Sequence, residues 1–358
     1  MRNKQKKLLA LILCMFLLIS GCGNSAATAT AEIETTSVIS GEEAALSSWT
    51  DGADHMKQQI IDYVERVTDE KNTTDFIPVC DRIATFDMDG TILCEKPDSL
   101  ELIVTEHRIT TDLKDNTELN AKLELLLKEF AMDPQPEDIW TLYGEVVDSA
   151  FSGMTDDEVV EYFSTYLQEA PSKQFSGLKY ADTVYYPMIE LIRYLQQNEF
   201  EVFLVSGSMR SALWGCVESY NEAYPDMPVN LDRSHMIGSD VEQVWEKNTD
   251  VNASDFGQKD RIVFGETRLS SNIGMTKVYN IANQIGKIPV FSCGNTDGDF
   301  SMLNYAKSNE YSSMALLVWH DSEKEIVYNT SEEWKEKAKE NGWKLISMAN
   351  DFVQIFPK

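Results

Sequence analysis

The stretch Arg82-Ile83-Ala84-Thr85-Phe86-Asp87-Met88-Asp89-Gly90-Thr91 is the most informative part of this sequence. It begins with a short apolar run, which is typical of a buried β-strand. The run ends at Asp87 and Asp89, followed by a glycine and a hydroxyl. Because open α/β sheets keep their chemistry at the carboxyl ends of the strands, the stretch predicts a parallel sheet with a site at its edge.

Later apolar runs also end in polar clusters, and helical patterns separate them. The runs lie at 201–205, 288–293 and 315–319, and the clusters that follow contain Ser206 and Gly207, then Asn295, Asp297 and Asp299, then His320 and Asp321. Strands that alternate with helices indicate an α/β fold with a three-layer, mostly parallel sheet. The polar segment 242–270 predicts a hairpin or flap.

The block 98–198 has helical spacing almost throughout, which is far more chain than one crossover between strands requires. We therefore predict an inserted α-helical cap domain at 98–198 and a core domain formed by 48–97 and 199–358. The aromatic residues of the block are expected to form the core of the cap, with an aromatic box for a choline-like cation as the alternative; they are Trp140, Tyr143, Phe151, Phe163 and Tyr166.

The N-terminus has the features of a targeting segment. A basic start precedes an apolar run at 8–19, which predicts a signal peptide at 1–21. Cys22 follows small residues and resembles the lipidated cysteine of bacterial lipoproteins; an ordinary secretory signal is the alternative. Residues 22–47 lack periodicity and predict a flexible tether. These features predict a lipid-anchored, extracytoplasmic protein of the bacterial cell envelope, attached to the membrane through Cys22.

Charge and cysteine usage narrow the choice of partners and cofactors. The net charge of −28 argues against a nucleic-acid partner, which would require a basic surface. There is no C-x-x-C pattern, which excludes zinc ribbons and thioredoxin-like chemistry. An extracytoplasmic location would permit a disulfide, but buried thiols are the simpler interpretation of Cys80, Cys94, Cys216 and Cys293.

The predicted strand ends together offer carboxylates, a hydroxyl and glycines with free backbone N–H groups. Phosphoryl transfer needs a nucleophile, positive charge beside the phosphoryl oxygens and a proton for the leaving group. A carboxylate can attack phosphorus and form an aspartyl-phosphate. Several carboxylates beside a phosphate would repel it unless a cation lay among them, and oxygen ligands suit Mg²⁺.

Four segments resemble the motifs of the haloacid dehalogenase-like (HAD) phosphohydrolases. Residues 87–91 resemble the first motif, 203–207 the second, 275–277 the third and 294–303 the fourth. The resemblance covers about residues 55–350 and implies a Rossmann-like sheet. The predicted cap is similar to the helical caps of phosphoserine-phosphatase-like members, which close over the phosphate and select the leaving group.

The resemblance also implies catalytic roles. Asp87 would be the nucleophile, and Asp89 would protonate the leaving alcohol and later activate water. Ser206 and the Gly207 N–H would hold phosphoryl oxygens, and Lys277 would bridge Asp87 and the phosphate. Family members of the dehalogenase branch lack the second aspartate, so Asp89 favours hydrolysis of a phosphoester.

The implied Mg²⁺ site consists of Asp87, the backbone carbonyl of Asp89, Asn295 and Asp299. Many relatives carry an aspartate where this chain has Asn295, and a neutral amide oxygen is a weaker ligand. A calcium loop is the alternative for Asp87 and Asp89, but an EF-hand needs a third acid before its glycine and a later glutamate. An apolar strand precedes this pair instead.

Three further residues are candidates for substrate contact. Glu95 lies near the position where related enzymes use a glutamate to bind a substrate amine. Arg210 follows Ser206 closely and is expected either to contact an anion or to cap its helix. His320 is expected either to contact substrate or to form structural hydrogen bonds. Amine-bearing substrates such as phosphoserine or phosphocholine are therefore among the candidates.

The sequence thus predicts a Mg²⁺-dependent phosphatase that hydrolyses a small phosphomonoester through an aspartyl-phosphate intermediate. Two alternatives remain open. One is a non-catalytic envelope lipoprotein that binds a phosphorylated ligand, which the neutral side chain of Asn295 favours. The other is a phosphotransferase, in which an alcohol rather than water accepts the phosphoryl group.

Overall fold

A computed structural model describes residues 46–52, 55–132, 135–250, 252 and 254–357. The predicted signal peptide at 1–21, Cys22 and nearly all of the predicted tether lie outside these residues. Among the residues that are described, no helix is both long and apolar enough to cross a membrane.

The protein contains a seven-stranded sheet with the order β4-β3-β2-β1-β5-β6-β7. Its strands are β1 (Ile83–Phe86), β2 (Glu201–Met209), β3 (Met236–Glu246), β4 (Arg261–Ser270), β5 (Phe291–Gly294), β6 (Met314–Trp319) and β7 (Lys344–Ser347). Every pairing is parallel except β3 with β4. The α/β fold with a mostly parallel sheet is therefore confirmed.

The strand β1, which contains the apolar run of the opening stretch, lies between β2 and β5. Phe86 at its end pairs with Leu204 of β2 and with Cys293 of β5. The residues that follow these three parallel strands therefore meet at one edge of the sheet. This register explains why the first, second and fourth sequence motifs converge.

Helices cover both faces of the sheet. The helices outside the block 100–169 are α1 (Met56–Thr68), α6 (Tyr186–Gln197), α7 (Arg210–Ala223), α8 (Met275–Gln284), α9 (Phe300–Lys307), α10 (Glu332–Asn341) and α11 (Met348–Asp351). Val202 and Leu204 of β2 pack in the cluster that includes α1, α6 and α7, whereas Phe203 and Val205 pack with residues of α8 and α9. Alternate side chains of a strand point to opposite faces, so this division produces the predicted three layers.

The block between β1 and α6 forms a further group of helices, which packs against α7. It contains α2 (Leu100–Thr111), α3 (Thr117–Phe130), α4 (Ile139–Phe151) and α5 (Asp156–Glu169). A capping box starts α5, because the Thr155 hydroxyl accepts from the Glu158 N–H and the Glu158 carboxylate accepts from the Thr155 N–H. The predicted cap segment 98–198 also includes α6, which packs against β2. The division into core and cap domains stays a prediction.

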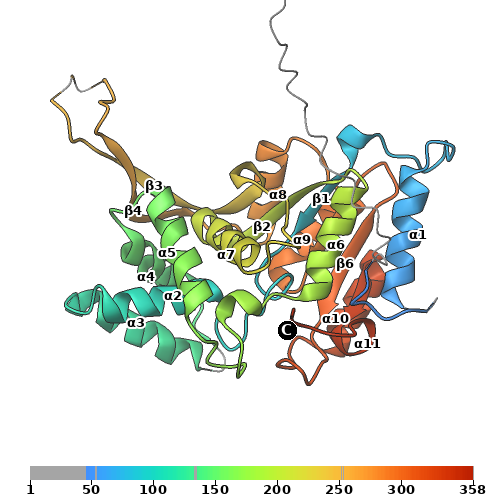
Figure 1. Ribbon diagram of the computed structural model, residues 1–358, viewed down its shortest axis with the longest axis horizontal. Helices are drawn as coiled ribbons and strands as arrows, with labels where there is room; N and C mark the ends of the chain where they lie inside the picture. The colour runs from blue at the N-terminus through green and yellow to red at the C-terminus, as the bar shows by residue number, and fades with distance from the viewer. Residues whose placement is uncertain (1–45, 53–54, 133–134, 251, 253, 358) are drawn as a thin grey trace, which may run out of the picture. The chain divides into compact units, whose positions relative to one another are not determined.

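The antiparallel strands β3 and β4 form the expected hairpin, whose pairing begins at Asp240 and Ser270, while the start of β3 pairs in parallel with β2. The hairpin joins the sheet to the helices α2–α5, which gather beside it in Figure 1. Arg268 of β4 forms a bidentate ion pair with Asp148 of α4, with Nη2 2.7 Å from Oδ1. The Phe264 N–H donates to the Met154 carbonyl at 2.8 Å. The hairpin is therefore part of the packing of the helical block.

The four described cysteines are free thiols. Cys94, Cys216 and Cys293 are buried, as expected, but Cys80 is exposed. The expectation of a buried thiol was therefore wrong for Cys80, which belongs to the short 3₁₀ turn before β1 rather than to an apolar run.

Candidate active site

A buried lysine lies at the centre of the site. The Lys277 ammonium donates to Asp87 Oδ1 at 2.6 Å, to Asp299 Oδ1 at 2.7 Å and to the Val205 carbonyl at 2.6 Å. Burial alone would lower the pKa of Lys277, but the Asp299 and Asp87 carboxylates outweigh it and raise the pKa. The lysine is therefore charged and joins the ends of β1 and β2 to the loop after β5.

The segment between β4 and α8 is held in place by Asn272, which is fully buried. Its side-chain amide donates to the carbonyls of Ser206, at 2.9 Å, and Ile237, at 3.1 Å. Gly274 then adopts a φ of +56°, a left-handed conformation that favours glycine, directly before α8. These features set the start of the helix that carries Lys277.

Asp87 lies directly after β1 and is buried. Burial raises the pKa of its carboxyl and the Asp299 charge raises it further, whereas Lys277 opposes both effects. The Thr91 hydroxyl is 3.3 Å from Asp87 Oδ2, the oxygen that Lys277 does not contact. One carboxylate oxygen is thus held by a cation, and the other has only a long contact with a hydroxyl.

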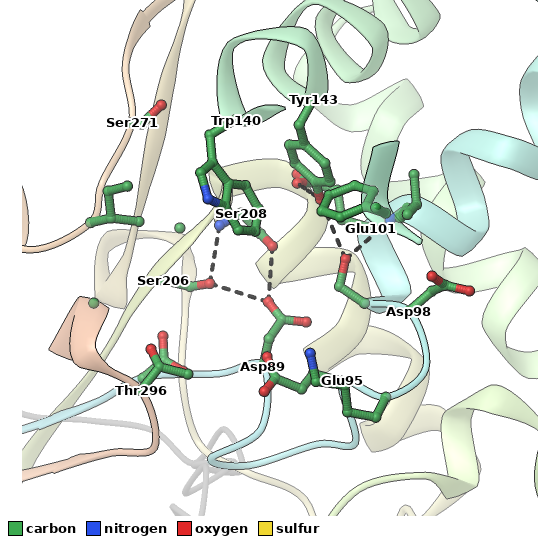
Figure 2. A pocket seen from close by; sticks show the side chains of 18 of the residues that line it. Asp89, Glu95, Asp98, Glu101, Trp140, Tyr143, Ser206, Ser208, Ser271 and Thr296 are labelled. Atoms are coloured by element: carbon green, nitrogen blue, oxygen red, sulfur yellow. Dashed lines mark hydrogen bonds between the residues drawn. The ribbon is translucent and has the colours of Figure 1, made fainter. Parts of the chain in front are cut away.

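Asp89 has a different environment from Asp87. Its Oδ2 accepts from the Ser208 hydroxyl at 2.9 Å and from the Ser206 hydroxyl at 3.4 Å (Figure 2). Its Oδ1 is buried without a hydrogen-bond partner. Burial, followed by the charges of Glu95 and Glu101, raises the pKa of Asp89 to about 7. This carboxyl is therefore able to give and take a proton near neutral pH.

The loop after β5 is held by Asp299. Its Oδ2 accepts from the backbone N–H groups of Asn295, at 2.9 Å, and Thr296, at 3.0 Å. The Asn295 amide nitrogen donates to Glu95 Oε1 at 3.0 Å, and its amide oxygen lies 3.3 Å from the Thr91 hydroxyl. A β-carbon at Gly90, where φ is +77°, would lie only 1.9 Å from the Asn295 amide nitrogen. Gly90 therefore permits the close approach of these two loops.

The side chains at this edge of the sheet carry oxygen donors, which hard cations such as Mg²⁺ prefer as ligands. Among the described residues, no group of three or more His, Cys, Asp or Glu side chains converges as a metal site. Mg²⁺ needs only one or two protein carboxylates, because waters and substrate phosphate oxygens complete its coordination. Asp87 and Asp299, the Asn295 amide oxygen and the unpartnered Asp89 Oδ1 are oxygen donors of the required kind. The donor set fits Mg²⁺, and the assignment of individual ligands stays a prediction.

A cavity of about 460 Å³ adjoins these groups. Most of the predicted site residues line it, namely Asp87, Asp89, Glu95, Ser206, Gly207, Lys277 and Asp299. Asn295 is fully buried and is not among the lining residues. Arg210 is exposed at the start of α7 and does not line the cavity either. The structure therefore brings these seven residues together around one cavity, with Asn295 bonded to Glu95, and leaves Arg210 and His320 off the cavity wall.

Sequence reasoning missed two residues that contact the site. Ser208 bonds Asp89 more closely than Ser206 does, and its position two residues after Ser206 in the same strand is a signal that could have revealed it. Glu101 of α2 is buried and accepts from the Met209 N–H at 2.7 Å and the Tyr143 hydroxyl at 2.6 Å. No local pattern distinguishes Glu101 from the other acids of the helical block.

His320 lies behind the first-motif loop rather than on the cavity wall. It is fully buried, and its ring nitrogens contact the Gly90 carbonyl at 2.8 Å and Glu325 Oε2 at 2.9 Å. The Tyr328 hydroxyl lies 3.0 Å from His320 Nε2. Of the two expectations for this histidine, these contacts favour the structural role.

The raised pKa of Asp89 predicts a pH-dependent stability. Between about pH 4 and pH 7 the folded protein retains a proton on Asp89 that the unfolded chain has lost, so wild-type stability falls over this range and is level above it. Replacing Asp89 with Asn removes this charge. We expect the free energy of unfolding of Asp89→Asn to exceed that of wild type by on the order of 4 kcal/mol at pH 8 and to equal it near pH 4.

Urea unfolding without divalent cations, from pH 4 to pH 8, would measure this difference. The control is Asp226→Asn, which removes an exposed carboxylate that does not line the cavity. If the curves of Asp89→Asn and wild type run parallel across this range, Asp89 does not titrate as described.

Comparison with known proteins links the site to a family. Residues 84–244 match the family described as haloacid dehalogenase-like hydrolase. This range contains β1 and β2, with Asp87 and Asp89 after β1 and Ser206 within β2. A search of curated proteins gave no match.

Several solved structures are similar to the chain at low sequence identity. A functionally unknown protein from Anaerococcus prevotii has 13% identity and a TM-score of 0.50, covering 83% of this chain and 94% of its own. A protein of unknown function from Bordetella pertussis has 12% identity and a TM-score of 0.46, covering 75% and 99%. Cytosolic 5'-nucleotidase IIIB bound to cytidine has 10% identity and a TM-score of 0.43, covering 80% and 83%. Over residues 84–244, the chain is thus similar in sequence to haloacid dehalogenase-like hydrolases, and its sheet has the α/β architecture expected of them.

Proposed function

We propose that the protein is a Mg²⁺-dependent haloacid dehalogenase-like phosphatase that hydrolyses a small phosphomonoester through an aspartyl-phosphate. The observation that carries this proposal is the pairing of Lys277 with Asp87 and Asp299 next to a second aspartate, Asp89, whose pKa is about 7. This arrangement supplies a nucleophile, a fixed cation and a proton donor beside one cavity. The family match over residues 84–244 supports the same chemistry.

In the first step Asp87 Oδ2 attacks the phosphorus atom. A bond forms between this oxygen and phosphorus, and the bond from phosphorus to the alcohol oxygen breaks. Asp89, protonated near neutral pH, gives its proton to the departing alkoxide. The Ser206 hydroxyl, the Gly207 N–H and the Lys277 ammonium would hold the phosphoryl oxygens during the transfer.

In the second step water hydrolyses the aspartyl-phosphate. Asp89 is now ionised and takes a proton from the attacking water. A bond forms between the water oxygen and phosphorus, and the bond to Asp87 Oδ2 breaks. Inorganic phosphate leaves, and Asp87 returns to the carboxylate with Asp89 protonated for the next cycle.

A Mg²⁺ ion would be held by Asp87, the Asp89 backbone carbonyl, Asn295 and Asp299. When bound, it would supply positive charge that offsets the phosphate dianion and the surrounding carboxylates. The site requires this additional positive charge, because in the described chain Lys277 is the one cation next to both Asp87 and Asp299. The neutral Asn295 side chain would make this site weaker than one with a third carboxylate.

Removing the nucleophile tests the mechanism directly. We expect Asp87→Asn to lower p-nitrophenyl phosphate turnover with Mg²⁺ by at least about 1,000-fold, since the amide cannot form the covalent intermediate. The matched control is Asp297→Asn in the loop after β5, an exposed residue that does not line the cavity, which should stay within about twofold of wild type.

Equal rates for Asp87→Asn and wild type would overturn the covalent mechanism. Binding of phosphate and Mg²⁺ without turnover of any ester would instead favour the non-catalytic binding lipoprotein. Faster transfer of phosphate to an added alcohol than to water would favour the phosphotransferase.

The proposed metal site predicts a response to chelation and to a change at Asn295. EDTA should abolish turnover, and Mg²⁺ should restore it. Asn295→Asp alone would put a carboxylate beside the Glu95 carboxylate, which now accepts a hydrogen bond from the Asn295 amide. The test therefore combines Asn295→Asp with Glu95→Gln, so that the two carboxylates do not repel each other. We expect the double variant to bind Mg²⁺ roughly tenfold more tightly by calorimetry, because a charged ligand replaces a neutral one. Unchanged Mg²⁺ affinity would remove Asn295 from the ligand set.

We also propose that the protein is attached to the outside of a bacterial membrane through a lipidated Cys22. This proposal rests on the basic and apolar N-terminal sequence. Expression with a radiolabelled fatty acid should label wild type and Cys80→Ser but not Cys22→Ser, and Cys22→Ser should leave the membrane fraction. Labelled, membrane-bound Cys22→Ser would contradict the anchor.

A further inference from the structure

Acidic side chains outnumber basic ones around the cavity. The acids are Asp87, Asp89, Glu95, Asp98, Glu101 and Asp299, of which Asp89 holds a proton near neutral pH, and the basic residues are Lys96, Arg268 and Lys277. Two of the cations are already neutralised. Lys277 pairs with Asp87 and Asp299, and Arg268 pairs with Asp148, which is fully buried outside the lining.

Lys96, the remaining cation, makes no close ion pair with the acids around it, although its charge partly offsets the rise that burial causes in the pKa of Glu95 and Asp98. Its ammonium lies 5.3 Å from the centre of the Tyr328 ring. In the described chain it forms no ion pair with Glu95, Asp98 or Glu101, and none of these acids has another ion-pair partner. In the part of the cavity beyond the phosphate end, the acids Glu95, Asp98 and Glu101 therefore outnumber the one cation that has no close acidic partner, Lys96.

The neighbouring wall of the cavity is aromatic. Phe130, Trp140 and Tyr143 all line it and pack edge to face, with ring centres 5.6 Å apart for Phe130–Trp140 and Trp140–Tyr143 and 6.0 Å for Phe130–Tyr143. Trp140 keeps 55% of its surface exposed. Figure 2 shows Trp140 and Tyr143 entering together on the side of the cavity opposite Asp89 and Glu95. An uncovered indole close to carboxylates is an environment that attracts an organic cation.

The charge balance distinguishes between classes of leaving group. A phosphate brings further negative charge into a space already rich in carboxylates. A sugar or other neutral alcohol could hydrogen-bond to these acids but would leave their charge uncompensated. An ammonium group a few bonds from the phosphate would offset that charge and could lie against the aromatic rings.

We propose that the alcohol released from this cavity carries a positive charge, most favourably a quaternary ammonium. Trp140 and Tyr143 contact its methyl groups, and Asp98 and Glu101 supply the compensating negative charge. This inference rests on the proposed phosphatase function. It corrects the expectation that Trp140 and Tyr143 only fill the interior of the helical block, since both line the cavity.

A pair of esters that differ only in charge tests the inference. Phosphocholine and 3,3-dimethylbutyl phosphate have the same shape, but carbon replaces the charged nitrogen in the second. We expect wild type to hydrolyse phosphocholine with a kcat/KM about tenfold or more above that of the neutral ester, as a desolvated cation–π contact implies. Equal values, with both esters hydrolysed, would overturn the inference and leave the proposed phosphatase function intact.

Two variants locate the origin of the preference. Trp140→Leu and Asp98→Asn should each reduce the ratio of the two kcat/KM values several-fold. The matched controls are Phe256→Leu and Asp226→Asn, an exposed aromatic and an exposed acid that do not line the cavity, and they should keep the wild-type ratio. A ratio that is unchanged in both cavity variants would show that the preference does not come from this wall.

A binding measurement separates the inference from the catalytic proposal. Calorimetry of wild type with choline and with 3,3-dimethylbutanol needs no turnover. Tighter binding of choline, together with no hydrolysis of p-nitrophenyl phosphate, would support the cation site and contradict the phosphatase. Equal or absent binding of choline would overturn the cation site whatever the catalytic result.

Discussion

The structure depends most on the burial of one ammonium group among oxygen atoms. Lys277 comes from α8, yet its contacts are Asp87 after β1, Asp299 after β5 and the Val205 carbonyl of β2. Removing the ammonium would leave two buried carboxylates without a counter-charge, which typically costs 3–5 kcal/mol, on the order of the net stability of a domain. The same contact that orders three strand ends also leaves Asp87 Oδ2 without a cation. Stability and the proposed reactivity therefore come from one arrangement.

Much of this arrangement could be predicted from the sequence, because residues at the carboxyl ends of neighbouring parallel strands lie close together at one edge of the sheet. Asp87, Ser206 and Asp299 are far apart in the chain, but Asp87 follows β1, Ser206 lies in β2 and Asp299 comes after β5, and these three strands are neighbours in register. Local apolar runs therefore sufficed to predict which residues would meet. Arg210 shows the limit of this reasoning: it is close to Ser206 in sequence, but the chain has already turned into α7, where the side chain is exposed.

The features that the sequence did not reveal depend on packing between elements without a strong local signal. Glu101 is one acid of an amphipathic helix, and only the approach of α2 to the end of β2 makes it a buried acceptor for the Met209 N–H. The Arg268–Asp148 pair likewise joins residues from the hairpin and α4 that have no pattern in common. Both contacts set the charge around the cavity. The specificity of the site is therefore harder to predict from sequence than its chemistry.

Asn272 lies between two parts of the protein that the chain connects directly, the hairpin and the helix α8. The hairpin strand β4 is tied to the helical block through Arg268, and only residues 271–274 separate β4 from the helix that carries Lys277. Within that short connection, Asn272 is bonded to the carbonyls of Ser206 and Ile237 in the sheet. Because Asn272 fixes this connection to the sheet, the position of Lys277 beside Asp87 and Asp299 depends on the sheet rather than on the hairpin and the helices attached to it.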